Sequence, residues 1–521
     1  MAAPAVSDTE EVLEVDDIQG LVVRSYHRFE ARFLLLLVQD AAKARAYLGK
    51  LADRINAASE RPETFALQIA FTGAGLRELE VPKHIVDTFA RELTEGMDQT
   101  DRADALGDRD LNDPSTWDWG HETEGTADVR APRRVHAMLM VYALDNLLET
   151  HVKSEKAAFE GGFTIVREKF SKTLPEHREH FGWRDGLSMP KIAGVPPAPD
   201  RSLDAKPREW WTTKIPPGEF VLGYRNDYSN DEDKARVYTE SPTVSFADDP
   251  ANLLSVTRDG TSKDLGRNGT YLVYREMTQD VHAFWSYLAK QSREGGVDPA
   301  ARAIALGAKM VGRWPNGAPM TTSPASDDPA RRDENAFLYA EKRPDDQKDF
   351  IGVGCPRGAH IRRANPRDVL ALEDRDAHAA EMMARKHQMV RRGRPFGEPV
   401  SPTLDPREMI AATPDGAKRG LHFICLVGDI NRQFEFVQRA WIHSGNFDSM
   451  YKDGDPISGA RRPANRANPN DEFTCPAIPV RRKYREVPQF STLVGGAYFF
   501  LPGLRALRFF ARVPSAVGAP A

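Results

Sequence analysis

The sequence has little cysteine and no long apolar run, and these absences exclude several classes of protein. Only three cysteines occur in 521 residues, at positions 355, 425 and 475, and none belongs to a CxxC pair. A disulfide framework and a thiolate zinc site are therefore excluded. The apolar runs at 33–38 and 137–144 are far shorter than the roughly 18 residues that suggest a membrane span. We expect free cysteines and no transmembrane helix.

An excess of positive charge is also missing. Lys and Arg total 71 against 76 Asp and Glu, which gives a net charge of −5, so no polyanionic partner such as a nucleic acid is indicated. The first residues are acidic and lack the basic and apolar regions of a secretory or twin-arginine leader. With 40% hydrophobic residues, including 25 Phe and 13 Tyr, the composition is typical of a soluble globular protein. We expect a cytoplasmic location.

Short apolar runs and amphipathic stretches alternate in the first half of the chain. The pattern predicts strands at 33–38, 65–71, 135–142 and 163–166 and helices at 44–55 and 145–159. This βαββαβ order is the split βαβ of a ferredoxin-like unit, with a polar insert around residues 94–130 between its middle strands.

The second half repeats this order more loosely. It predicts strands at 271–274, 421–427 and 497–501 and helices at 281–288 and 430–441. Residues 315–415 are crowded with Pro, Gly, Asp and Arg, which a compact domain tolerates when a long loop is functional. We therefore expect an α+β fold of two ferredoxin-like halves, residues 1–245 and 246–521, each an antiparallel sheet with helices.

A glycine-rich loop at 350–367 contains GxGxxxG but does not fit a dinucleotide fingerprint. Such a fingerprint opens an apolar helix after a strand, whereas this loop runs into His360, several arginines and a proline. One imidazole among guanidinium groups suits a haem, which needs an axial nitrogen and cations for its propionates. The alternative is an ordinary polar histidine in a loop.

Two other stretches have both a functional and an ordinary interpretation. In Gly182–Gly186, Asp185 stands between glycines, which let the backbone approach a flat ligand; the alternative is a common Asp-Gly turn. Residues 389–397 are basic and rich in Pro and Gly, and include Arg391. Alone they would be a solvated basic turn or a phosphate-contacting patch.

In combination, these motifs are more specific. GxxDG, CPxGAHIRRANPRD and VRRGxPFG, in this order and at these separations, resemble the dye-decolorizing peroxidases, and the length is similar to the longer bacterial and fungal branch of that family. Further segments that resemble the family lie at 17–21, 218–224, 266–274, 311–315, 429–436 and 495–503.

The resemblance implies a haem-dependent peroxidase that reduces hydrogen peroxide and oxidises bulky dyes and phenolic donors in one-electron steps. The haem is expected between the sheet and the helices of the C-terminal half. Carried over by motif, His360 is the axial ligand of the haem iron, Asp185 the distal acid/base and Arg391 the distal arginine. Arg362 and Arg391 are expected to bind the cofactor. The chain has no CxxCH for covalent attachment, so we expect one haem b per chain.

An axial histidine normally donates its other N–H to an acceptor that fixes the ring. From the resemblance we expect this acceptor, which also belongs to the cofactor site, to be Asp448, with Glu435 and Asp429 as alternatives. Two departures from the family pattern, Arg357 and Arg394, are expected to add positive charge at the pocket rim, and a third, Met189, to alter that rim.

Other functions remain open at this point. The main alternative is a haem carrier or iron-extracting protein that uses His360 without turnover. A chlorite-dismutating relative would share the fold but would not demand GxxDG, and a nucleic-acid binder would need a salt-sensitive complex. For the peroxidase, the expected partners are hydrogen peroxide and organic electron donors, with no nucleic acid or membrane, and the chain is expected to be a monomer or a homodimer.

Overall fold

The first half of the chain folds into a four-stranded antiparallel unit. The computed structural model describes residues 12–121, 134–195, 214–227, 237–293, 298–340, 349–370, 377–461 and 470–513. Its first strands pair in the order β2-β3-β1-β4, all antiparallel, with the chain order βαββαβ. This is the ferredoxin-like arrangement expected from the sequence. The elements are β1 (Glu30–Val38), α1 (Ala41–Leu51), β2 (Phe65–Phe71), α2 (Gly73–Glu78), α3 (Lys83–Val86), α4 (Arg91–Glu95), α5 (Thr100–Leu106), β3 (Ala137–Ala143), α6 (Asp145–Ala158) and β4 (Phe163–Ser171).

The second half repeats the topology with larger insertions. Here the strands lie in the order β11-β13-β10-β16, and β12 also pairs with β13. Strand β16 meets β2 at Phe500 and Phe71, which joins the halves into one sheet. The elements are β10 (Thr270–Gln279), α8 (Val281–Gln291), α9 (Pro299–Val311), α10 (His360–Ala364), α11 (Ala377–Arg385), β11 (Val390–Arg391), β12 (Arg394–Phe396), α12 (Pro406–Ala411), β13 (Gly420–Val427), η10 (Ile430–Glu435), η11 (Val437–Ile442), β14 (Phe473–Cys475), β15 (Arg482–Tyr484), β16 (Ser491–Leu501) and α13 (Leu504–Phe510).

Short strands occupy the connection between the halves. β5 and β6 form a parallel pair, and β9 pairs antiparallel with both β7 and β8. These strands are β5 (Lys191–Ile192), β6 (Lys214–Ile215), β7 (Thr243–Val244), β8 (Ser255–Val256) and β9 (Lys263–Asp264). The boundary expected near residue 245 stays a prediction.

The continuous apolar run in β1 reflects a strand that is buried on both faces. Leu34 and Leu36 belong to the core beneath the helices, which includes residues of α1 and α13. Phe33 and Leu35 belong to a second core, covered by the loops around Leu21 and elsewhere. Since successive side chains of a strand point to opposite faces, a strand covered on both sides has no polar alternation.

The polar insert between β2 and β3 is structured rather than a simple loop. It carries α4 and α5 and then Trp117 and Trp119, both fully buried. The indole Nε1–H of Trp119 donates to Glu276 of β10 at 2.6 Å, so the insert from the first half packs on the sheet of the second. Residues 122–133 of the insert lie outside the described part.

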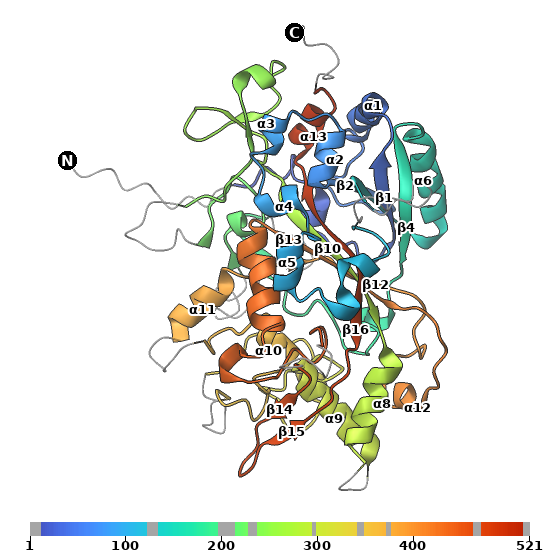
Figure 1. Cartoon of the computed structure of the whole chain (residues 1–521), viewed down its shortest axis with the longest axis vertical. Coiled ribbons are helices and arrows are strands. Elements are labelled where there is room, and N and C mark those ends of the chain that lie inside the picture. Colours follow the sequence, from blue (N-terminus) through green and yellow to red (C-terminus); the bar gives the residue numbers. More distant parts are fainter. Residues whose placement is uncertain are drawn as a thin grey trace, which may run out of the picture.

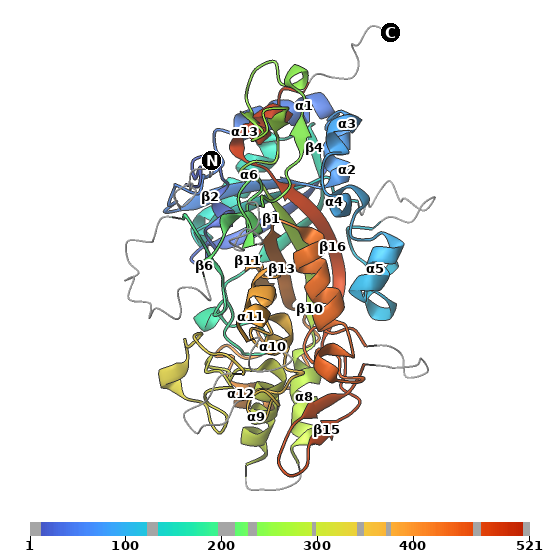
Figure 2. The same ribbon diagram turned by 90° about the vertical axis from the view of Figure 1, so that its left-hand side faces the viewer.

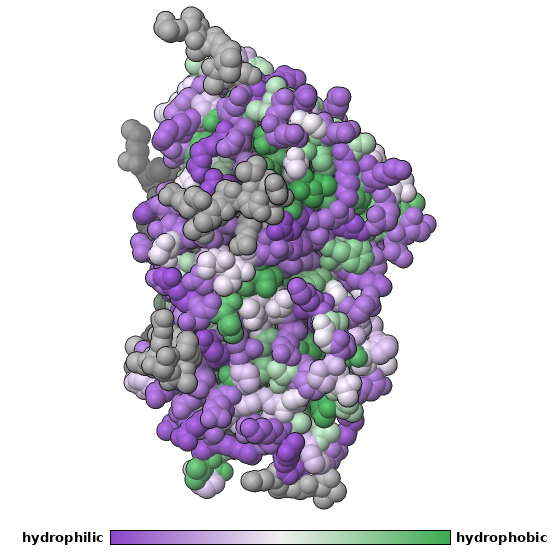
Figure 3. All heavy atoms as spheres, turned by 45° about the vertical axis from the view of Figure 1, so that its right-hand side comes forward, coloured by the Kyte–Doolittle hydropathy of each residue, from purple (hydrophilic) through white to green (hydrophobic). Residues whose placement is uncertain are grey.

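The molecule is elongated in Figures 1 and 2, with the first half at one end and α8, α9 and the β14–β15 hairpin at the other. The face in Figure 3 is mostly hydrophilic, with small scattered apolar areas. In the described residues, no helix is both long and apolar enough to span a membrane.

Candidate active site

A large cavity lies in the second half, between its sheet and the helices that cover it. Its volume is about 290 Å³. The floor comes from β10, β13 and β16, and the walls come from α10, η10 and η11 and from the loop that follows β4. Three motifs that are far apart in sequence, at 181–190, 360–367 and 387–393, therefore line one space. This is the position between sheet and helices at which the haem was expected.

His360 faces this cavity and is held by a carboxylate. It is the first residue of α10, and its Nδ1–H donates to Oδ2 of Asp455 at 2.9 Å. Asp455 is completely buried, and its other oxygen accepts the N–H groups of Ile457 and Ser458. Burial lowers the pKa of His360, but the Asp455 carboxylate raises it more, so the pKa lies above its ordinary value. No described residue bonds Nε2, which leaves that nitrogen available as a ligand.

The expectation that Asp448 orients His360 is wrong, and so are its two alternatives. The side chain of Arg357 donates from Nη1 to the backbone carbonyl of Asp448, and its Nε lies 3.5 Å from Oδ2 of Asp448. Glu435 accepts a hydrogen bond from Tyr498 at 2.8 Å, and Asp429 caps the first turn of η10. Asp455 is 95 residues from His360 in sequence. Only the folding of the chain brings its carboxylate to the imidazole.

Asp185 and Arg391 form an ion pair in another part of the cavity wall. The Nη1 atom of Arg391 lies 3.0 Å from Oδ1 of Asp185, and 34% and 40% of the two side chains stay exposed, which leaves both able to contact a ligand. Arg391 belongs to β11, which is fixed by pairing with Cys425 of β13. The backbone N–H of Asp185 donates to His177, so the pair joins a loop of the first half to the sheet of the second.

The surroundings of Asp185 keep its carboxyl ionised. Burial raises its pKa, but the Arg391 charge and the N–H of Gly186, 2.6 Å from Oδ1, lower it by more. The net pKa lies below the ordinary value of an aspartate. An ionised carboxylate beside a permanent cation can accept a proton and return it, which is the chemistry of general acid–base catalysis.

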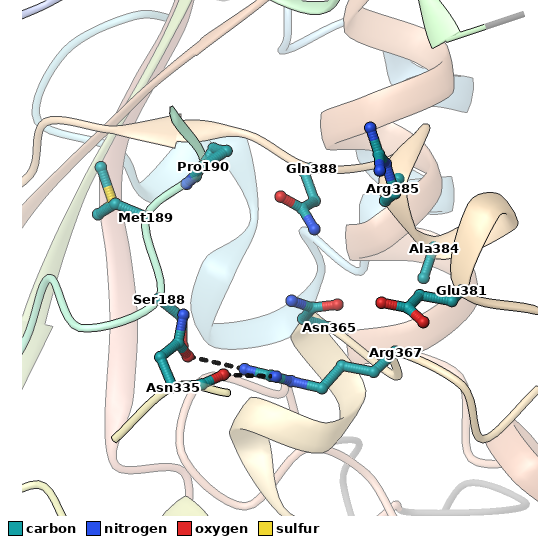
Figure 4. Close-up of a pocket in the computed structure, with 10 residues that line it drawn as sticks. All are labelled: Ser188, Met189, Pro190, Asn335, Asn365, Arg367, Glu381, Ala384, Arg385 and Gln388. Atoms are coloured by element: carbon teal, nitrogen blue, oxygen red, sulfur yellow. Dashed lines mark hydrogen bonds between the residues drawn. The ribbon is translucent and has the colours of Figure 1, made fainter. Parts of the chain in front are cut away.

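Two buried arginines supply positive charge to the same cavity. Arg313 and Arg367 bond to carbonyls and to Asn335, and neither forms an ion pair with a described carboxylate. Arg367 also borders a small polar recess beside the cavity (Figure 4). Burial, and then repulsion by Arg367, lowers the pKa of Arg313 to about 10. Buried cations without a counter-ion are costly, so this end of the cavity fits a ligand with anionic groups.

The expectation that Arg362 binds the cofactor is wrong. Its guanidinium is fully buried and donates to the carbonyl groups of Asp349, Cys355 and Phe350. Arg362 therefore stabilises the glycine-rich loop through these hydrogen bonds and does not line the cavity. Arg313 and Arg367, in contrast, do line the cavity. Both lie in segments that resemble the family, so the sequence did carry a signal for them.

Two of the three departures from the family pattern, Arg394 and Arg357, lie in different places from those expected. Arg394 is buried and donates to backbone carbonyls of Tyr26 and Phe29, and Arg357 lies over the Phe350 ring. Neither lines the cavity, so neither changes its charge. Met189 lines the small recess shown in Figure 4.

The cavity combines a carboxylate-backed imidazole, an aspartate–arginine pair and two buried arginines. These groups are of the kinds that can serve as an iron ligand, an acid–base group and cations for propionates. No family model matches the chain. Curated relatives, however, match the chain over nearly its whole length. The dye-decolorizing peroxidase msp1 of Mycetinis scorodonius is 27% identical over 95% of this chain and 87% of its own length. The multifunctional dye peroxidase DyP2 of an Amycolatopsis species is 27% identical over 95% of both.

A solved structure agrees in fold. A dye-decolorizing peroxidase in complex with 2,6-dimethoxyphenol superposes with a TM-score of 0.68 at 23% identity, covering 96% of this chain and all of the other. The chain is thus similar over nearly its whole length to curated dye-decolorizing peroxidases, and it shares the fold of solved members of that family. Another solved dye-decolorizing peroxidase with this fold, which superposes with a TM-score of 0.69 at 23% identity, has a haem pocket that was engineered for asymmetric sulfoxidation.

Proposed function

We propose that this chain binds one haem b and uses it to reduce hydrogen peroxide while oxidising phenols and bulky dyes. The observation that carries the proposal is the single cavity that His360, backed by Asp455, shares with the Asp185–Arg391 pair. The absence of CxxCH from the sequence supports a haem held without covalent attachment. A bound haem supplies the redox centre that takes two oxidising equivalents from peroxide and passes them on singly.

His360 would hold this group through Nε2. The Asp455 carboxylate fixes the ring and increases its basicity. Arg313 and Arg367 would pair with the two propionates, which would supply the counter-charge that the protein itself does not provide in its described part. His360, Arg313 and Arg367 thus would supply the nitrogen ligand and the cations that the cofactor requires.

Asp185 would move the proton that peroxide reduction requires. Its carboxylate accepts the proton from one peroxide oxygen and returns it to the other, which then leaves as water. Arg391 stabilises the negative charge that develops on the departing oxygen, and its charge keeps Asp185 ionised. Two donor molecules each give one electron, and two protons complete the second water.

The Asp185–Arg391 pair favours turnover over the alternative of a haem carrier. A carrier needs the axial ligand and the propionate contacts, but it does not need an acid–base group beside a cation in the same cavity. The phenol complex of the related peroxidase supports phenols as donors for this chain as well. A cytoplasmic location stays a proposal, as does a monomeric or homodimeric state.

The test is to load the purified chain with haem and add hydrogen peroxide with 2,6-dimethoxyphenol or a bulky dye. We expect a Soret band and steady peroxide-dependent oxidation of both donors. A Soret band without turnover would favour the carrier.

A further inference from the structure

A second carboxyl, that of Glu179, faces the cavity outside the Asp185–Arg391 pair. It lines the cavity and makes no ion pair with a cation in the described part of the chain. Its oxygens instead accept three hydrogen bonds. Oε1 accepts the backbone N–H of Trp183 at 3.1 Å, and Oε2 accepts the N–H of Phe181 at 2.9 Å and the side-chain amide of Gln279 at 2.8 Å.

These bonds hold together the turn that leads into Asp185. The segments on either side of the turn run antiparallel, with Arg178 opposite Arg184, and the N–H of Asp185 donates to His177 at 3.0 Å. Phe181 and Trp183 are buried at 1% and 3% exposure, so water cannot easily replace the acceptor for their N–H groups. Without it, two buried donors would lose their partner, which costs more than a surface hydrogen bond.

The third bond connects this turn to the cavity floor. Gln279 is the last residue of β10, the central strand beneath the cavity. Through Glu179, the loop that carries Asp185 is therefore tied to the same sheet that carries Arg391 through β13 and β11. Burial raises the pKa of Glu179 to about 7, against the lowering effect of these three donors.

We propose that Glu179 is the positioning residue of the distal loop: its carboxylate closes the 178–184 turn and anchors it to Gln279, which sets the position of Asp185 relative to Arg391. This inference rests on the proposed peroxidase function for its effect on rate, but not for its effect on the loop. Glu179 itself does not exchange a proton with peroxide in this account.

The chemistry of the three contacts requires an acceptor at both oxygens. A carboxylate accepts at each oxygen, whereas a glutamine amide places an NH₂ donor at one of them. In either orientation of that amide, at least one buried N–H of the turn then faces another donor. Glu179→Gln therefore keeps the volume of the side chain and removes at least one of the contacts on which the proposal depends.

The experiment compares E179Q with E176Q in the full-length, haem-loaded protein at about pH 8, above the pKa of Glu179, so that its carboxyl is ionised. Glu176 lies in the same loop, but its carboxylate pairs with Arg178 and is 66% exposed, so E176Q is a matched control that removes one negative charge. Two quantities are measured: amide hydrogen exchange of the 178–186 segment, and the rate of peroxide cleavage by stopped-flow absorbance, with haem content as a check.

We expect E179Q to speed exchange in this segment by roughly tenfold and to slow cleavage by roughly 10- to 100-fold, the effect of a small displacement of a catalytic group, with haem content unchanged. E176Q should match the wild type in both. If E179Q does not fold, Gln279→Met takes its place, with smaller changes in the same directions.

Different results would overturn the positioning role of Glu179 and the proposed peroxidase function. Wild-type exchange and wild-type cleavage in E179Q, or in Q279M where E179Q does not fold, would overturn the positioning role. Slow cleavage with unchanged exchange would also overturn it, because Glu179 would then act directly. No cleavage by the wild-type protein would contradict the proposed function, while the exchange measurement would still decide the role of Glu179 in the loop.

Discussion

The Nδ1 atom of His360 lies 2.9 Å from Oδ2 of Asp455, a carboxylate with no exposed surface. Burial raises the pKa of Asp455, but the imidazole and two backbone N–H groups lower it by more, so the carboxyl stays ionised. An anionic acceptor gives the axial imidazole more imidazolate character, which stabilises the oxidised states of a bound iron.

Asp455→Asn is therefore expected to retain haem and to shift its reduction potential upward. Asp448→Asn is the control, since Asp448 is a partly buried carboxyl that contacts Arg357 rather than His360. Spectroelectrochemical titration of the three proteins checks this. A shift in D448N and none in D455N would show that the structure assigns the wrong acceptor.

His360→Ala should purify largely without haem, because the cavity then offers no axial nitrogen from α10. His282→Ala is a suitable control, since His282 lies on α8 and contacts Ser286 outside the cavity. Absorbance of the Soret band per chain measures the effect. Normal haem content and an unchanged band in H360A would remove the assignment of His360 as the ligand.

The pH dependence of peroxide cleavage should depend on Arg391. Because Arg391 holds the pKa of Asp185 below its ordinary value, the wild type loses its base only when the pH falls through that lowered value. In Arg391→Leu the pKa of Asp185 rises, so the acidic fall in rate should move to higher pH. Arg391→Lys keeps the charge and should move it less.

The rates themselves should fall as well. Asp185→Asn should slow cleavage by roughly 10²–10⁴, the usual contribution of a positioned acid–base group, and most at low pH, where bulk base is scarce. R391L should cost roughly 10²–10³ or more with haem retained. Stopped-flow traces between about pH 4 and pH 7, where Asp but not Arg titrates, measure both. An acidic fall in rate at the same pH in R391L and in the wild type would show that Arg391 does not lower the pKa of Asp185.

Arg367→Leu should release haem faster, because one of two cations for the propionates is lost. The loss of one charge-assisted hydrogen-bonded pair corresponds to roughly tenfold or more in release rate. Arg357→Gln is the control, since Arg357 does not line the cavity. Transfer of haem to an apoprotein scavenger gives the rates. Equal release rates in R367L and R357Q would place the propionates elsewhere.

The sheets could be predicted from the sequence because their signals are local. The βαββαβ order depends on apolar runs such as 65–71, which is the observed β2. Helix α9 was missing from that expectation, although Asp298 caps it, Pro299 begins it and Gly312 ends it. The stretch at 430–441 was expected as a helix with Phe434 and Trp441 on one face; both are buried, but the helix is of the wider π type.

The candidate site could be predicted only where a residue sits in a motif. His360, Asp185 and Arg391 do, and all three line one cavity. Asp455 could not be distinguished from Asp448 in the sequence, because both are turn residues after η11 and only the fold shows which one reaches the imidazole. Arg362 and Arg367 are likewise alike in sequence, and the direction of each guanidinium follows from α10 and the loop after it.

The most direct test of the central claim is peroxide-dependent oxidation of 2,6-dimethoxyphenol by the haem-loaded wild type and by a D185N/R391L double variant. The account predicts turnover by the wild type and a Soret band of equal intensity in the double variant, with its cleavage rate reduced at least 10²-fold. Equal rates in the two proteins would contradict it, because the aspartate–arginine pair would then have no part in the reaction.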